Sequence, residues 1–131
     1  MNYLDSSALL KLLFDEPESA ALEDWTSARA GSPMVSSELA RVEVIRACRR
    51  LNPDALPEAR RLLASLDLVP LTRDLIDDAA EVGESTLRSL DAIHLASAIS
   101  IGADLTEFVV YDRRLAEAAS KAGLETIRPG G

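Results

Sequence analysis

Four acidic side chains in this sequence suit a shared metal site: Asp5, Glu43, Asp91 and Asp112. Carboxylate oxygens without cysteine or histidine partners are the ligands that Mg²⁺ and Mn²⁺ prefer. An ion held in this way activates water and stabilises the leaving oxygen in phosphoryl transfer. Carboxylates gathered without a cation would repel one another, so their convergence predicts a bound divalent ion. We therefore expect all four acids to form a catalytic Mg²⁺ (or Mn²⁺) site.

Two of these acids each follow a short strand and precede a helix. Residues 2–5 form a strand pattern ending in Asp5, and Phe108-Val109-Val110-Tyr111 is followed by Asp112. Ligands bind at the carboxyl ends of strands in open parallel sheets. An aspartate before a helix is also a common N-cap, the simpler interpretation of Asp5 alone. The recurrence of the arrangement favours a functional site, in which Ser7 either caps the helix or orients a ligand carboxylate.

The other two acids lie on predicted helices. Residues 37–51 have one apolar face, formed by Ala40, Val44, Ala47, Cys48 and Leu51. Glu43 lies at the border of this face, whereas Glu38 points about 140° away. A surface ion pair with Arg46 is the alternative for Glu43.

Asp91 lies in the first turn of a predicted helix at 89–101 that is apolar almost all round. The alternative to a metal ligand is an acid placed favourably near the positive end of the helix. His94, three residues later on the same face, is interpreted as a buried structural histidine rather than a general base.

The net charge of −8 is unusual for a nucleic-acid-binding protein, but a metal site built from carboxylates is acidic by construction. Nearly all the positive charge is arginine, which suits bidentate phosphate contacts. The candidate contacts to nucleic-acid phosphates are Arg46, Arg50 and Arg113. The alternative for each is a solvated helix face.

Length and composition predict one domain spanning residues 1–131, without a membrane span or signal peptide. The single cysteine, Cys48, excludes an internal disulfide and fits a reducing cytoplasm. The single histidine argues against a zinc site of the Cys/His type.

Strand and helix patterns alternate along the chain. The expected strands lie at 2–5, 34–36, 66–71, 108–111 and 124–128, and seven helices are expected between them. This order predicts a three-layer α/β/α sandwich around a mainly parallel sheet of about five short strands.

Four segments carry a resemblance to a known family: YLDSSALLKLL, SSELARVEVIRA, LRSLDAIHLASAISIG and FVVYDRRLAEAA. Together, in this order, they resemble the signature segments of PIN domains, specifically VapC-type toxins of type II toxin–antitoxin pairs. The resemblance implies a PIN-like fold and a Mg²⁺- or Mn²⁺-dependent endoribonuclease. Asp5, Glu43, Asp91 and Asp112 match its acidic cluster, and Ser7 matches its small hydroxyl residue. Val110 departs from the pattern, because relatives often carry a hydroxyl there.

The resemblance also implies partners. These are a VapB-like antitoxin that blocks the site, an RNA substrate and a second copy of the chain, with DNA contacted only through the antitoxin. Leu10, Phe14 and Trp25 could line a partner groove or belong to the core.

Two other functions remain open. One is a catalytically silent PIN-like module that only binds a partner. The other is a different carboxylate–Mg²⁺ enzyme, such as a phosphatase. The haloacid-dehalogenase type would need an aspartate where Ser7 stands.

Overall fold

A parallel sheet of five strands forms the centre of the computed structural model, which describes residues 1–131. The strand order is β3-β2-β1-β4-β5, and every neighbouring pair is parallel. The strands are β1 (Asn2–Leu4), β2 (Met34–Ser37), β3 (Asp67–Val69), β4 (Glu107–Val109) and β5 (Thr126–Ile127). The outer strands β3 and β5 are shorter than the sequence pattern predicted, because only these residues find ladder partners.

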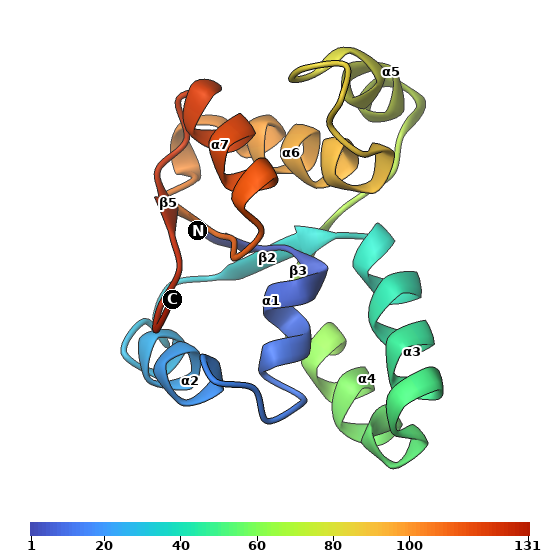
Figure 1. The fold of residues 1–131 in the computed structure, drawn as a ribbon, viewed down its shortest axis with the longest axis vertical. Helices are drawn as coiled ribbons and strands as arrows, with labels where there is room; N and C mark the ends of the chain where they lie inside the picture. The colour runs from blue at the N-terminus through green and yellow to red at the C-terminus, as the bar shows by residue number, and fades with distance from the viewer.

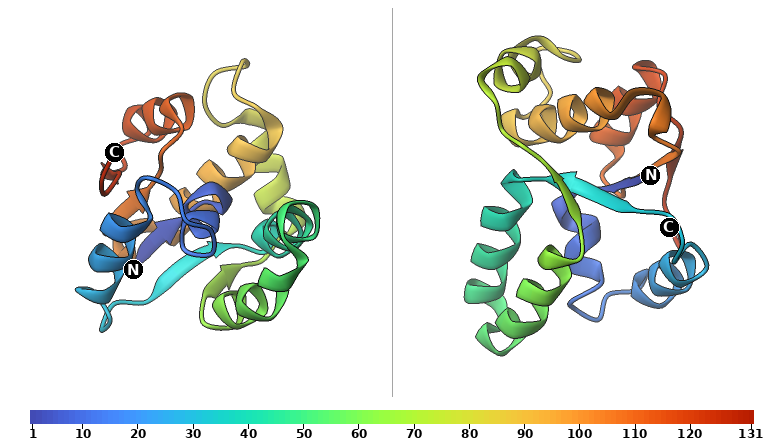
Figure 2. Two further views of the ribbon diagram at one scale, coloured as in Figure 1. Left: turned by 60° about the horizontal axis from the view of Figure 1, so that its bottom comes forward. Right: turned by 180° about the vertical axis from the view of Figure 1, so that it is seen from behind.

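Helices cover both faces of the sheet (Figures 1 and 2). One face carries α1 (Ser6–Lys11), α2 (Ser19–Ser27), α3 (Leu39–Leu51) and α4 (Leu56–Ala64). The other carries α6 (Ser89–Ile101) and α7 (Arg113–Lys121), with α5 (Arg73–Glu81) packed against α6. Short 3₁₀ helices occupy Pro53–Ala55 and Gly102–Asp104. The predicted α/β/α sandwich is confirmed.

The central strand β1 is buried on both faces, as expected for parallel sheets covered by helices. Successive side chains of a strand point to opposite faces. Leu4 therefore packs into the core beneath α1 and α3, whereas Tyr3 packs with Val35 and Phe108 into the core beneath α6 and α7.

The strand order reverses beside β1, and this reversal positions the site. The chain runs from β1 to β2 and β3 on one side and returns to β4 on the other. Leu4 pairs with Val109, so β1 and β4 end at the same level. The helices that follow these strands diverge there, which opens a crevice at their carboxyl ends. Figure 1 shows the N-terminal ends of α1, α3, α6 and α7 around this edge.

One apolar residue differs from expectation, and the positions of three others bear on whether they belong to the core. Leu51, assigned to the apolar face of its helix, is 61% exposed. A helical wheel predicts the direction of a side chain but not whether another element lies there. Trp25 is buried in the core, while Leu10 and Phe14 are partly buried against it.

No helix in the structure combines the length and apolarity needed to cross a membrane.

Candidate active site

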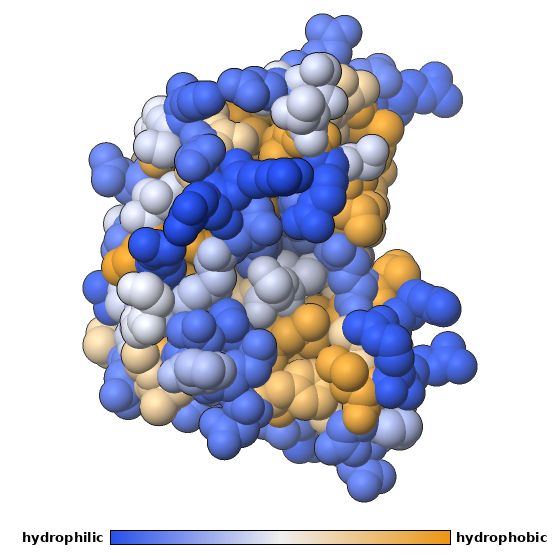
Figure 3. Space-filling view, in the orientation of Figure 1, coloured by the Kyte–Doolittle hydropathy of each residue, from blue (hydrophilic) through white to orange (hydrophobic).

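All four predicted acids line one cavity of about 760 Å³ at the carboxyl ends of β1 and β4. Asp5 follows β1, Glu43 lies on α3, Asp91 on α6, and Asp112 precedes α7. In Figure 3, hydrophilic side chains surround the hollow between the upper and lower helices, and apolar surface lies below it in the region of α1, α3 and α4. Four separate elements thus bring carboxylates to one solvent-accessible place.

Asp5 both caps a helix and faces the cavity. Its Oδ1 accepts a hydrogen bond of 2.9 Å from the Ala8 amide, and Ser7 Oγ lies 3.0 Å from each carboxylate oxygen. Asp5 is only 4% exposed. Burial raises its pKa above the ordinary value, although the nearby His94 ring and the Ala8 amide oppose the rise. The two interpretations of Asp5, helix cap and site acid, are therefore compatible.

Glu43 is held by a hydroxyl and a ring nitrogen rather than by Arg46. Ser6 Oγ donates to Glu43 Oε1 at 2.5 Å, and His94 Nε2 lies 2.8 Å from the same oxygen. Burial works to raise the pKa of Glu43, but these two hydrogen bonds outweigh it and the pKa lies below its ordinary value. The carboxylate is thus kept ionised and fixed in place.

His94 connects this carboxylate to the sheet. The ring is 2% exposed, and its Nδ1 lies 2.7 Å from the hydroxyl oxygen of Tyr3. Burial raises the pKa of Tyr3, so this phenol keeps its proton and can donate it to Nδ1. The Nε2–H then donates to Glu43, which fixes one tautomer. His94 is buried and hydrogen-bonded, as interpreted from the sequence.

Asp91 and Asp112 share one basic partner, Arg88, the residue before α6. Arg88 Nε lies 2.8 Å from Asp91 Oδ2, and Arg88 Nη2 lies 3.5 Å from Asp112 Oδ2. Asp112 also caps α7 by accepting from the Leu115 amide at 2.9 Å. The guanidinium therefore bridges acids from two different elements.

The side-chain atoms that line the cavity are of the chemical type that a hard divalent cation binds. The cavity offers carboxylate oxygens and no thiolate, and one of the acids, Asp5, is buried without a basic partner. As the side chains stand, no three of the acids converge closely enough to hold a single ion. Asp91 and Asp112 are instead turned to Arg88.

The predicted basic residues divide between two places. Arg46 and Arg50 line the same cavity as the acids, whereas Arg113 lines a neighbouring hollow together with Arg128. The structure thus brings the first two, but not Arg113, into the cavity of the acids.

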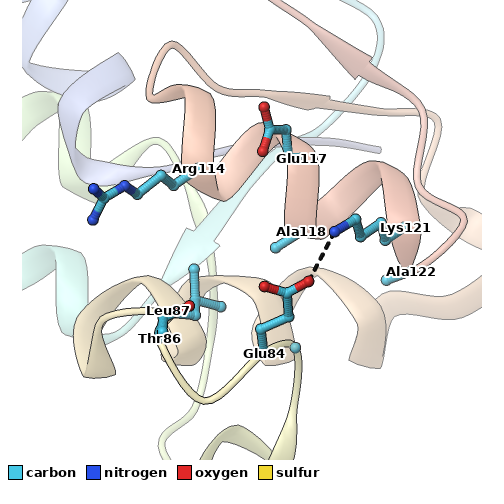
Figure 4. Close-up of a pocket in the computed structure, with 9 residues that line it drawn as sticks. Glu84, Thr86, Leu87, Arg114, Glu117, Ala118, Lys121 and Ala122 are labelled. Atoms are coloured by element: carbon cyan, nitrogen blue, oxygen red, sulfur yellow. Dashed lines mark hydrogen bonds and ion pairs between the residues drawn. The ribbon is translucent and has the colours of Figure 1, made fainter.

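A separate cavity of about 700 Å³ lies between α7 and the segment preceding α6 (Figure 4). A 2.9 Å ion pair between Lys121 and Glu84 crosses it. None of the four predicted acids lines it, so it is distinct from the candidate active site.

Sequence reasoning missed two residues that contact the acids, Ser6 and Arg88, and a third, Tyr3, that contacts His94. Arg88 stands three residues before Asp91, a helical spacing that would have pointed to their ion pair. The contact of Tyr3 with His94 joins residues 91 positions apart, so no local signal could have revealed it.

Comparisons with known proteins agree with this fold. Residues 3–121 match the family model of the PIN domain. The chain is 46% identical to Ribonuclease VapC47 and 44% identical to Ribonuclease VapC35, both from Mycobacterium tuberculosis. Each alignment covers 99% of this chain and 98% of the relative. The chain therefore belongs to the PIN-domain family, among the VapC ribonucleases.

Two solved structures share the fold at low sequence identity. The Mycobacterium tuberculosis toxin VapC20, described as cleaving the sarcin–ricin loop, superposes with a TM-score of 0.77 at 19% identity, covering 98% of this chain and all of that one. VapBC2 from Rickettsia felis, solved with a promoter DNA fragment, gives a TM-score of 0.75 at 11% identity, covering 98% of this chain and 99% of that one.

Proposed function

We propose that this chain is the toxin of a type II toxin–antitoxin pair and a Mg²⁺- or Mn²⁺-dependent endoribonuclease. The observation that supports the proposal is the convergence of Asp5, Glu43, Asp91 and Asp112, from four elements, on one polar cavity. The names of the relatives, ribonucleases that match almost the full chain, support the same activity. Residues 1–131 would act as one domain.

The four acids would hold the divalent ion, and Ser7 would keep the Asp5 carboxylate oriented. When bound, such an ion supplies activation of water and neutralisation of charge on the phosphate. The role of the protein itself is to present ionised carboxylate oxygens in fixed positions. Glu43 fits this role because Ser6 and His94 hold its carboxylate in the charged form.

Arginines would position the RNA backbone. Arg46 and Arg50 are exposed at the cavity wall and form no ion pair with the acids there, so both are free to contact phosphates. Arg113 would add a contact from the neighbouring hollow.

The partners follow from the same assignment. A VapB-like antitoxin would cover the cavity and inhibit the enzyme, two copies of the chain would form a homodimer, and DNA would be reached only through the antitoxin. The Rickettsia felis VapBC2 structure, solved with a fragment of promoter DNA, supports the pairing with a VapB-like antitoxin.

Expression without the antitoxin tests the function directly. We expect induction of the wild-type chain to arrest growth and Asp5→Asn to relieve the arrest. Asp77→Asn, an exposed acid of α5 outside the cavity, is the matched control and should remain toxic. Equal toxicity of Asp5→Asn and wild type at matched protein levels would contradict the nuclease assignment and favour a silent binding module.

A further inference from the structure

Arg88 is the only lysine or arginine that forms an ion pair with any of the four cavity acids. Its guanidinium contacts Asp91 at 2.8 Å and Asp112 at 3.5 Å, and its side chain is 65% exposed. A guanidinium stays protonated in proteins. Arg88 therefore places a permanent positive charge between two of the four candidate ligands.

Proximity to the cavity does not explain this placement. Arg46 and Arg50 line the same cavity, yet neither forms an ion pair with an acid. Arg88 stands at the N-cap of α6, where its backbone is extended, and from there the side chain reaches both the first turn of α6 and the start of α7. The extended backbone at Arg88 thus allows its side chain to bridge Asp91 and Asp112.

We propose that Arg88 is a displaceable counter-cation, which neutralises Asp91 and Asp112 before metal binding and moves to an RNA phosphate when the ion takes those carboxylates. This inference rests on the proposed function. A carboxylate that points its oxygens at a guanidinium cannot offer the same oxygens fully to a metal ion, so the two cations compete. Because exposed ion pairs are weak, the exchange has a low energetic cost.

The released side chain suits a phosphate. A guanidinium binds phosphate oxygens through two parallel N–H bonds, as it binds carboxylates. The substrate backbone would bring this new partner into the same cavity. Arg88 would therefore contribute little to RNA binding while it is held by the acids, and more once the divalent ion is present.

The affinity for a divalent ion tests whether Arg88 competes with the metal for Asp91 and Asp112. Mn²⁺ is titrated into the purified full chain by calorimetry, for wild type, Arg88→Ala, Arg46→Ala and Arg41→Ala. Arg41 is the matched control, because it is also 65% exposed and pairs with Glu38 at a spacing of three residues, outside the cavity. Arg46→Ala controls for the removal of positive charge at the cavity wall. We expect Arg88→Ala alone to bind Mn²⁺ more tightly, by about two- to fivefold, the equivalent of an exposed ion pair.

RNA binding tests whether the Arg88 side chain is released from the two acids when the metal ion binds. A short labelled RNA is mixed with each variant in EDTA or Mn²⁺, and anisotropy is followed by stopped flow before cleavage proceeds. We expect Arg88→Ala to weaken RNA binding with Mn²⁺ and to leave it unchanged in EDTA. A reduction of equal size in both conditions would overturn the exchange.

The outcomes separate the two proposals. Absence of Mn²⁺ binding by wild type would overturn the proposed function and this inference together. Mn²⁺ binding of equal affinity by wild type and Arg88→Ala, or an equal gain in Arg46→Ala, would overturn only the role of Arg88.

Discussion

Nε2 of His94 lies 2.8 Å from Oε1 of Glu43, so a buried ring on α6 holds the cavity carboxylate of α3. The other nitrogen of the ring contacts the Tyr3 hydroxyl at 2.7 Å. A chain of hydrogen bonds thus runs from the central strand to the cavity. Buried polar networks of this kind contribute to stability only when each member is paired.

Tyr3→Phe should reduce the free energy of unfolding by about 1–3 kcal/mol, because it leaves the buried Nδ1 of His94 without a partner. Denaturant unfolding measures the change. Tyr111→Phe is the control, since its hydroxyl donates to the Pro129 carbonyl at a partly exposed position where water can replace it. Equal destabilisation of the two variants would contradict a special role for the His94 contact.

Asp5→Asn should stabilise the metal-free protein at neutral pH. Burial raises the pKa of Asp5 above 3.8, so the folded state binds the proton more tightly than the unfolded state does. The wild type therefore loses stability as the pH rises from about 4 to the folded pKa, and the ionised carboxylate remains unfavourable above it. Asparagine does not titrate, and its side-chain oxygen can still accept from the Ala8 amide.

Thermal melting in EDTA across this pH range measures the effect. The advantage of Asp5→Asn over wild type should shrink as the pH falls towards 4, where the wild-type carboxyl is protonated in both states. A stability difference that does not vary with pH would indicate that the buried charge is not its cause. Excess Mn²⁺ should stabilise wild type but not Asp5→Asn, since ligands that bind only the folded state raise its stability.

RNA cleavage should be abolished in EDTA and restored by Mg²⁺ or Mn²⁺ but not by Ca²⁺. The physical reason is that Ca²⁺ is larger and takes a looser coordination than the near-octahedral oxygen sites of Mg²⁺. Gel analysis of a structured RNA incubated with each ion provides the measurement. Undiminished cleavage in EDTA would rule out the metal mechanism.

Arg46→Ala and Arg50→Ala should each weaken RNA binding and flatten its salt dependence. The slope of log affinity against log salt should fall by up to about one unit for each phosphate that the variant no longer neutralises. Binding titrations over a series of salt concentrations give this slope. Arg41→Ala, which lies outside the cavity, should retain the wild-type slope. If both cavity variants also retained it, these arginines would be ordinary solvated residues.

The local sequence already indicated much of the candidate site. A strand, an acid and a helix follow one another at Asp5 and again at Asp112, and each acid is placed by its own N-cap geometry. Hydrophobic periodicity predicted the alternation of strands and helices, and hence the parallel sheet, because both signals depend on residues close together in the chain. It also placed Glu43 at the edge of a core face, although it placed Leu51 on that face wrongly.

The partners of the acids depended on the tertiary structure. Glu43 contacts His94, 51 residues away, rather than Arg46, one helical turn away. Arg88 joins Asp91 to Asp112 only because α6 and α7 cover the same face of the sheet. Local periodicity gives the direction of a side chain from its own helix or strand, but its partner is set by which elements the strand order brings side by side.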